Sequence, residues 1–122
     1  KASELASSFA DSKTTATKKI IGGGYDGLYG KQFDLIINAT AASLKGEVPP
    51  LPESIISPET CCYDMMYAAQ PTAFMLWASK HQVQNISDGL GMLVGQAAES
   101  FYIWRGVKPE VVPVIESIRN AM

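Results

Sequence analysis

The stretch Phe33-Asp34-Leu35-Ile36-Ile37-Asn38-Ala39 decides the fold, because it is a nearly unbroken apolar run of strand length. Such a run favours a strand that is covered on both faces, which is typical of parallel sheets. The proline-rich segment 49–52 then predicts an extended loop, and Ser57-Pro58-Glu59 predicts a turn. A second strand is expected from Cys61 to Tyr67.

A helix is predicted to begin near Thr72, whose hydroxyl can cap the free amides, and to run to Lys80 and His81. The cationic end suits the helix dipole, so His81 is interpreted as a charge and cap residue and not as a catalytic base. The alternation of strands with helices predicts an α/β fold with a parallel sheet.

Two more helices are expected toward the C-terminal end. An extended piece from Val83 to Ile86 leads into Asp88-Gly89-Leu90-Gly91, and the long apolar helix that follows runs to Trp104, closed by Arg105 and Gly106. The last helix is predicted to start at Pro109 as its first helical residue. Its apolar side is formed by Val111, Val114, Ile115 and Ile118.

The N-terminal stretch is less regular. A helix is predicted from Lys1 to Ala10, and Asp11 to Gly30 is interpreted as a short strand followed by a flexible turn at Gly22-Gly23-Gly24. No initiator methionine and no capping residue precede the first helix, so the chain is expected to be a piece of something longer.

Length and charge narrow the class of protein. A chain of 122 residues suits one domain, and a net charge of −2 with mixed signs makes nucleic acid and membrane surfaces poor partners. No apolar run approaches the ~20 residues of a membrane span and no secretion signal is seen, so a cytoplasmic location is expected. The adjacent Cys61 and Cys62 are interpreted as reduced thiols, and no metal site is expected.

Three segments together resemble the shikimate dehydrogenases in sequence, order and spacing. They are Phe33 to Thr40, Tyr63-Asp64-Met65-Met66-Tyr67, and Asp88-Gly89-Leu90-Gly91 followed by Met92 to Ala98. The similarity runs from about residue 33 to the end. It implies that residues 1–122 are the C-terminal part of an NADP-binding domain with an incomplete Rossmann-like sheet, whose C-terminal helices pack toward an absent substrate domain.

The same resemblance implies what this chain lacks. The family's glycine-rich loop, its Asn-Arg-Thr motif for the NADP ribose phosphate, and its lysine and aspartate that handle the proton are not present. No catalytic residue is therefore expected here, and the isolated chain is expected to be inactive. Gly22-Gly23-Gly24 does not replace the phosphate loop, because the strand, spacing and helix of the dinucleotide fingerprint are missing.

Candidate ligand contacts lie after the two strands. Ligands of open α/β sheets bind beyond the carboxyl ends of the strands, which places Asn38-Ala39-Thr40 and Met65-Met66-Tyr67 near a cofactor and substrate. The resemblance implies that Met65 lines the nicotinamide site and that the Tyr67 hydroxyl meets the substrate. The alternative is that both side chains only pack. Asp64 is interpreted as structural.

Three further residues are candidates for binding. Gln96 shares a helix face with Met92, Leu93 and Ser100, so it is expected to be a buried amide that needs partners. The resemblance implies that it binds the substrate hydroxyls, and the alternative is that it bonds to nearby backbone. Gly89 is expected either to allow a close backbone approach at the nicotinamide or to be a loop glycine with positive φ. Lys1 either lies at the edge of the NADP phosphate site or is simply solvated.

The resemblance implies an NADP-dependent oxidoreductase that interconverts 3-dehydroshikimate and shikimate on the route to chorismate and the aromatic amino acids. One alternative is a quinate/shikimate dehydrogenase that uses NAD. Another is a non-catalytic binding or assembly module, because an uncovered edge or face of the sheet invites pairing with a second chain, and self-association is therefore expected.

Overall fold

The structure is a computed structural model that describes residues 1–9 and 20–122. Its centre is a parallel sheet of β1 (Leu35–Asn38), β2 (Cys61–Asp64) and β3 (Asn85–Ser87), in the order β1-β2-β3. Both pairs of neighbouring strands are parallel, with Leu35 opposite Cys61 and Cys61 opposite Asn85. The predicted α/β class with a parallel sheet is confirmed.

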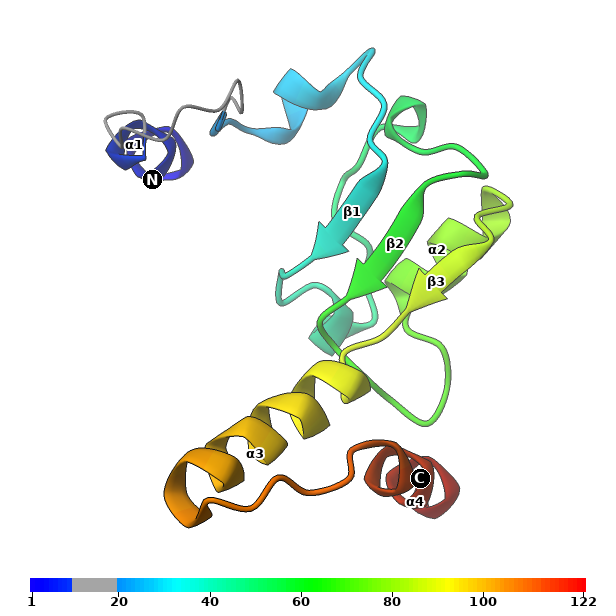
Figure 1. The fold of residues 1–122 in the computed structure, drawn as a ribbon. Coiled ribbons are helices and arrows are strands. Elements are labelled where there is room, and N and C mark those ends of the chain that lie inside the picture. Colours follow the sequence, from blue (N-terminus) through cyan, green and yellow to red (C-terminus); the bar gives the residue numbers. More distant parts are fainter. Residues whose placement is uncertain (10–19) are drawn as a thin grey trace.

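Helices lie behind and beyond the sheet (Figure 1). The α-helices of the described residues are α1 (Ala2–Ser8), α2 (Ala73–Lys80), α3 (Leu90–Arg105) and α4 (Val112–Ala121). Short 3-10 helices are η1 (Tyr25–Leu28), η2 (Ser43–Lys45) and η3 (Glu53–Ile55). Helix α2 connects β2 to β3 behind the sheet, whereas α3 continues from the end of β3 away from the strands, with α4 beside it (Figure 1).

The hydrophobic core lies between one face of the sheet and α2. Its buried members are Ile55, Ile56, Cys62, Phe74, Ala78 and Val83. Phe74 is completely buried and stacks on Trp77, with ring centroids 5.6 Å apart. Burial of a side chain of this size contributes about 1.5–3 kcal/mol, so this apolar contact helps to hold α2 against the sheet.

The opposite face of the sheet is open in the described residues. Leu35 and Ile37 are 54% and 55% exposed, and Cys61 beside them is also exposed. These positions alternate with the buried Asn38 and Cys62 because successive side chains of a strand point to opposite faces. The expectation that the first strand is covered on both faces is therefore wrong for the part of the chain that the structure describes.

Strand β2 ends at Asp64, three residues before the predicted end at Tyr67. The Oδ1 atom of Asp64 accepts a hydrogen bond from the backbone N–H of Met66 at 3.1 Å. This local turn directs the backbone out of the ladder, because a side chain now binds the amide that a neighbouring strand would otherwise bind. Met65–Tyr67 consequently form a loop beyond the strand.

The last helix begins at Val112, and the predicted start at Pro109 is wrong. Pro113 falls in the first turn of the observed helix, where its missing N–H costs nothing. A helix that started at Pro109 would place Pro113 in its interior, where it removes a backbone hydrogen bond.

The predicted ends of α2 and the predicted C-terminal end of α3 are confirmed. The Thr72 hydroxyl accepts from the Met75 amide at 3.3 Å and caps α2, and His81 follows as its C-cap. Helix α3 ends at Arg105, and Gly106 closes it in the left-handed conformation, with φ of 71°. Glycine suits that position because it has no Cβ to clash.

The N-terminal segment differs from the prediction. The first helix covers Ala2–Ser8, while the expected strand and turn lie partly in residues 11–19, outside the described part of the chain. Residues 20–24 form no strand, and Tyr25–Leu28 form η1. Gly22 packs closely against the first helix and does not serve only as a flexible turn, because a Cβ atom at this position would overlap the carbonyl of Ala2.

Two further features are the absence of a membrane-spanning helix among the described residues and the state of the cysteines. Within residues 1–9 and 20–122, no helix combines the length and apolarity that crossing a bilayer requires. Both cysteines are free thiols, as predicted.

Candidate functional site

The two loops predicted to hold ligands leave the sheet next to each other. Asn38, the last residue of β1, pairs with Asp64, the last residue of β2. The amide of Met65 then donates to the carbonyl of Asn38 at 3.0 Å. The segments Asn38–Thr40 and Met65–Tyr67 thus start from one edge of the sheet, as the strand pattern predicted.

Asp64 is the centre of a buried polar network at this edge, and its side chain is fully buried. Its carboxylate accepts hydrogen bonds from Asn38 Nδ2 at 3.3 Å, Ser43 Oγ at 2.7 Å, Thr72 Oγ1 at 2.6 Å and the Met66 amide at 3.1 Å. A buried carboxylate is tolerated when its lone pairs are satisfied in this way. The network joins β1, β2 and α2, which supports the structural interpretation of Asp64.

The side chain of Asn38 also has its hydrogen bonds inside the protein. Its Nδ2 donates to Ser43 Oγ at 2.9 Å as well as to Asp64, and its Oδ1 accepts from the amide of Thr40 at 3.2 Å and from Thr40 Oγ1 at 2.8 Å. Asn38 is buried, whereas Ala39 and Thr40 are exposed. Of the three predicted residues, Ala39 and Thr40 are therefore those that a ligand can reach.

Gly89 packs its backbone directly against the loop after β2. Its φ is −78°, so positive φ is not the reason for glycine at this position. A Cβ at Gly89 would overlap the carbonyl oxygen of Met65, and the Gly89 amide donates to the Met66 carbonyl at 2.9 Å. The close approach of the Met65 carbonyl therefore explains the glycine at this position, while the expected approach to the nicotinamide stays a prediction.

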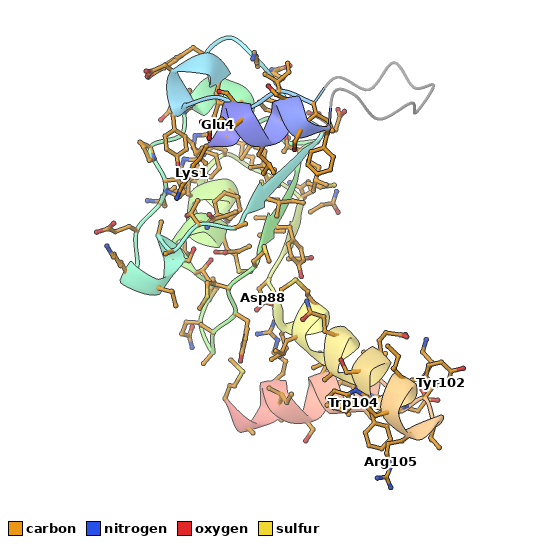
Figure 2. All side chains as sticks on the ribbon, turned by 90° about the vertical axis from the view of Figure 1, so that its left-hand side faces the viewer. Lys1, Glu4, Asp88, Tyr102, Trp104 and Arg105 are labelled. Atoms are coloured by element: carbon orange, nitrogen blue, oxygen red, sulfur yellow. The ribbon has the colours of Figure 1, made fainter. Side chains whose placement is uncertain are left out.

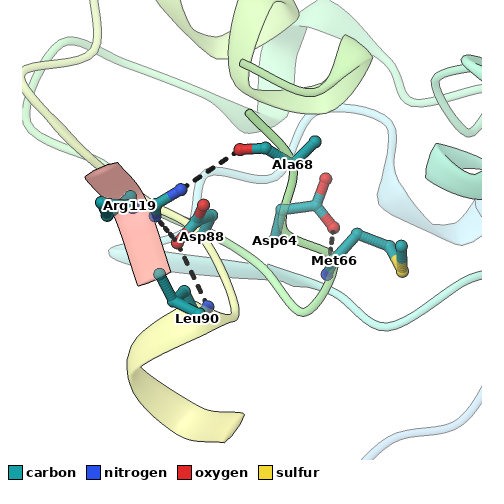
Figure 3. A network of polar contacts seen from close by, with 6 residues as sticks. All are labelled: Asp64, Met66, Ala68, Asp88, Leu90 and Arg119. Carbon is teal, nitrogen blue, oxygen red and sulfur yellow. Dashed lines mark hydrogen bonds and ion pairs between the residues drawn. The ribbon is translucent and has the colours of Figure 1, made fainter. Parts of the chain in front are cut away.

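Arg119 forms a second connection between these segments, which no sequence pattern predicted (Figure 3). Its guanidinium forms an ion pair with Asp88 and donates to the Ala68 carbonyl at 3.2 Å. The Asp88 carboxylate also accepts from the Leu90 amide at 3.2 Å, at the start of α3. The helix dipole alone explains why an arginine occurs near the C-terminal end of a helix, so nothing in the sequence indicated that Arg119 makes this contact.

Met65 and Tyr67 are accessible, with 40% and 37% of their surfaces exposed. They lie on the loop that Asp64, Gly89 and Arg119 hold in place. An apolar thioether and a phenol on one short loop can contact a flat ring and a hydroxylated ligand. Met65 and Tyr67 are therefore the candidates in this loop for contact with a flat ring and with a hydroxylated ligand.

Gln96 is exposed, so the expectation of a buried amide is wrong. The buried residues of α3 are Leu90, Val94 and Ala98, on the opposite side of the helix from Gln96. The helix is apolar nearly all round, and its sequence pattern therefore could not identify the buried face. Gln96 lies seven residues after Gly89, about 10 Å along the helix.

Lys1 lies apart from the other candidates. Its side chain is fully exposed just before α1, and this helix lies on the β1 side of the sheet, away from α3 and α4 (Figures 1 and 2). Among the described residues its polar contacts are local: the terminal amine pairs with Glu4 at 3.3 Å, and the Lys1 carbonyl accepts from the Leu5 amide at 2.9 Å.

An open groove of about 510 Å³ lies under α4, next to the Asp88–Arg119 pair. Tyr63, Ser87, Met92 and Ile115 contribute to its walls. None of the predicted site residues lines it. The accessible candidates are instead on the loops at the strand ends.

His81 and Cys62 have structural roles. His81 Nδ1 lies 2.9 Å from the Trp77 carbonyl, and its ring packs on the Trp77 ring with centroids 4.9 Å apart. Burial raises the pKa of the Cys62 thiol to about 11, and the neighbouring Cys61 adds to this increase. Cys62 is therefore protonated and unreactive near neutral pH.

The family model and the curated relatives that match this chain point to the same family. Residues 89–119 match the family model of the Shikimate 5'-dehydrogenase C-terminal domain. The chain is 52% identical over 122 residues to a shikimate dehydrogenase (NADP(+)) of Cellvibrio japonicus, covering 100% of this chain and 42% of the relative.

Solved structures with this fold include an Ael1 enzyme from Pseudomonas putida, at 39% identity and a TM-score of 0.75, covering 82% of this chain and 37% of that one. A shikimate dehydrogenase solved in complex with NADP+ is 33% identical with a TM-score of 0.56, covering 72% of this chain and 30% of that one.

The chain spans 42% to 44% of the length of three curated relatives, all named shikimate dehydrogenase (NADP(+)). Over that part, identity is 47% to 52% and at least 99% of this chain is covered. The chain belongs to the shikimate dehydrogenase family.

Proposed function

We propose that the protein containing this chain, at the length of its relatives, is an NADP-dependent shikimate dehydrogenase that interconverts 3-dehydroshikimate and shikimate. It is called the full-length protein below. The observation that carries the proposal is the contact of Gly89 with Met65 and Met66 at the strand ends, because Gly89 begins the segment that matches the family model. The names of the relatives, and the NADP+ in one solved structure, support the same activity.

In this proposal, residues 1–122 are the C-terminal part of the NADP-binding domain, and α3 and α4 pack toward a separate substrate domain. Bound NADPH supplies a hydride, which reduces the ketone of 3-dehydroshikimate to the alcohol of shikimate while a proton reaches the oxygen. The residues of this chain orient the reactants, and proton transfer belongs to groups outside it.

Each accessible candidate has a role in this scheme. Met65 and the Gly89 backbone border the nicotinamide, and Ala39 and Thr40 contact the cofactor with Asn38 fixing their loop. The Tyr67 hydroxyl and the Gln96 amide bind the substrate; both groups can donate and accept hydrogen bonds, as a polyol acid requires. Lys1 lies at the edge of the NADP phosphate site, a role that its full exposure allows.

The experiment is a steady-state assay of the full-length protein, following nicotinamide absorbance with shikimate or quinate and with NADP+ or NAD+. We expect the highest kcat/KM for the shikimate and NADP+ pair, and no turnover by the isolated 122-residue chain. Preference for quinate with NAD+ would favour the alternative enzyme, and a lack of turnover with all four pairs would contradict both. A cytoplasmic location and a place in aromatic amino acid biosynthesis stay predictions.

A non-catalytic assembly role is the second candidate, favoured by the exposed Leu35 and Ile37 on the open face of the sheet. A strand face of this kind is a site of association when no other part of the protein covers it. Light scattering of the isolated chain should then show a mass that rises with concentration, whereas a monomer at all concentrations would contradict this role.

A further inference from the structure

Arg119 contacts both segments that form the proposed site. Its Nη1 donates to the carbonyl of Ala68, the residue after Tyr67, and its other terminal nitrogen pairs with Asp88, the residue before Gly89 (Figure 3). The guanidinium is planar and carries several donors in a fixed arrangement, so it can fix the distance between two acceptors.

The link closes a loop of contacts around the site. At one end, the Gly89 amide binds the Met66 carbonyl; at the other end, Arg119 joins Ala68 to Asp88. The backbone between these two connections includes Tyr67. Because two separate contacts hold the loop, its position relative to α3 is restricted more than either contact alone would restrict it.

The Asp88–Arg119 pair is partly shielded from solvent, which favours a persistent contact. The Asp88 side chain is only 8% exposed, and its carboxylate also accepts from the Leu90 amide. The Asp88 partner raises the pKa of Arg119 above its ordinary value. Since Arg119 comes from the last turn of α4, the pair also connects this helix to the strand ends.

We propose that Arg119 is a positioning residue for the reaction. By bridging Ala68 and Asp88 it holds Met65 and Tyr67 at the distance from Gly89 that the nicotinamide and the substrate require. This inference rests on the proposed function. It adds a residue that contacts neither reactant and acts through the loop that does.

The kinetic test uses Arg119→Gln and Arg119→Lys in the full-length protein, with Tyr67→Phe alone and combined with Arg119→Gln. Arg119→Gln should lower kcat for shikimate oxidation by about tenfold to a hundredfold, as small misplacements of reactants do. Arg119→Lys keeps the positive charge but loses the planar guanidinium with its several donors, so it should restore part of the rate that Arg119→Gln loses. If Arg119 acts through the loop, Tyr67→Phe should lower kcat by a smaller factor in the Arg119→Gln background than it does alone.

The control is Lys108→Gln, which removes an ion pair with Glu99 on α3, away from the site. It should leave kcat within about twofold, because exposed pairs contribute little. Unchanged kcat in Arg119→Gln, or effects of Arg119→Gln and Tyr67→Phe that simply multiply, would refute the positioning role.

Hydrogen–deuterium exchange tests the same role without relying on activity. Arg119→Gln should speed amide exchange by about tenfold at Gly89 and between Met65 and Ala68, where local opening exposes the amides, while Lys108→Gln should not. Equal exchange in wild type and Arg119→Gln would overturn the proposal. If the wild-type protein does not oxidise shikimate, the proposed function fails, and exchange alone decides whether Arg119 fixes this loop.

Discussion

The hydroxyl of Thr72 donates to the carboxylate of Asp64 at 2.6 Å and also accepts from the Met75 amide, so one side chain both caps α2 and satisfies the buried acid at the end of β2. The position of α2 and the position of the loop after β2 therefore depend on the same hydrogen bonds.

Thr72→Val should lower the free energy of unfolding by about 2–4 kcal/mol, because it removes a helix cap and a hydrogen bond to a buried carboxylate. Urea unfolding of the full-length protein measures this loss. Thr72→Ser is the matched control, since it keeps the hydroxyl, and should cost less than about 1 kcal/mol. A loss in Thr72→Ser as large as the loss in Thr72→Val would show that the methyl group contributes as much as the hydroxyl, which contradicts this prediction.

Gly89→Ala should lower the free energy of unfolding by about 1–3 kcal/mol and should also reduce activity, because the added Cβ overlaps the Met65 carbonyl and displaces the loop. Gly95→Ala in the same helix meets no atom within 4 Å and should raise stability by about 0.5–1 kcal/mol. Thermal or urea unfolding compares them. A stabilised Gly89→Ala protein with wild-type kcat would contradict the close contact.

Tyr67→Phe and Gln96→Ala should each lower kcat/KM for shikimate by about one or two powers of ten, because each removes a hydrogen-bonding group from the proposed substrate site. Steady-state kinetics with saturating NADP+ measures the change. Tyr102→Phe removes a hydroxyl from the exposed surface at the far end of α3, visible in Figure 2, and should have no effect. Wild-type kinetics in both test variants would remove these residues from the site.

The Cys62 thiol should make stability fall at alkaline pH. Its pKa is raised from 9.0 to about 11 by burial, so folding favours the protonated thiol. The contribution is fully present below the unfolded pKa and is lost as pH rises from about 9 through about 11. Unfolding free energies of wild type and Cys62→Ala, measured across this window, should converge with rising pH, and parallel curves would be inconsistent with the raised pKa.

The first parts of the fold could be predicted because local chemistry determines them. The apolar run at 33–39, the cap at Thr72 and the left-handed Gly106 identified β1, α2 and the end of α3. The end of β2 was misplaced because a side-chain hydrogen bond of Asp64 redirects the chain, and periodicity does not report such a contact. The start of α4 was misplaced although Pro113 could have corrected it.

The site was predicted only in part for a similar reason. The segments Asn38–Thr40 and Met65–Tyr67 were placed together because they follow adjacent strands, and topology puts those positions at one edge of the sheet. Gln96 was expected to be buried and is exposed, since a helix that is apolar on all sides has no pattern from which to identify its inner face.

The sequence by itself determined the α/β class and the parallel order of elements, because these depend on residue types at short spacing. The family followed from the resemblance of three segments to shikimate dehydrogenases. Only the tertiary structure decided that the Asn38 side chain forms hydrogen bonds inside the protein. It also decided that Gly89 approaches Met65 and that Arg119 joins Ala68 to Asp88. Those contacts join residues between 24 and 51 positions apart, and no local pattern encodes the partner of a group so distant in the chain.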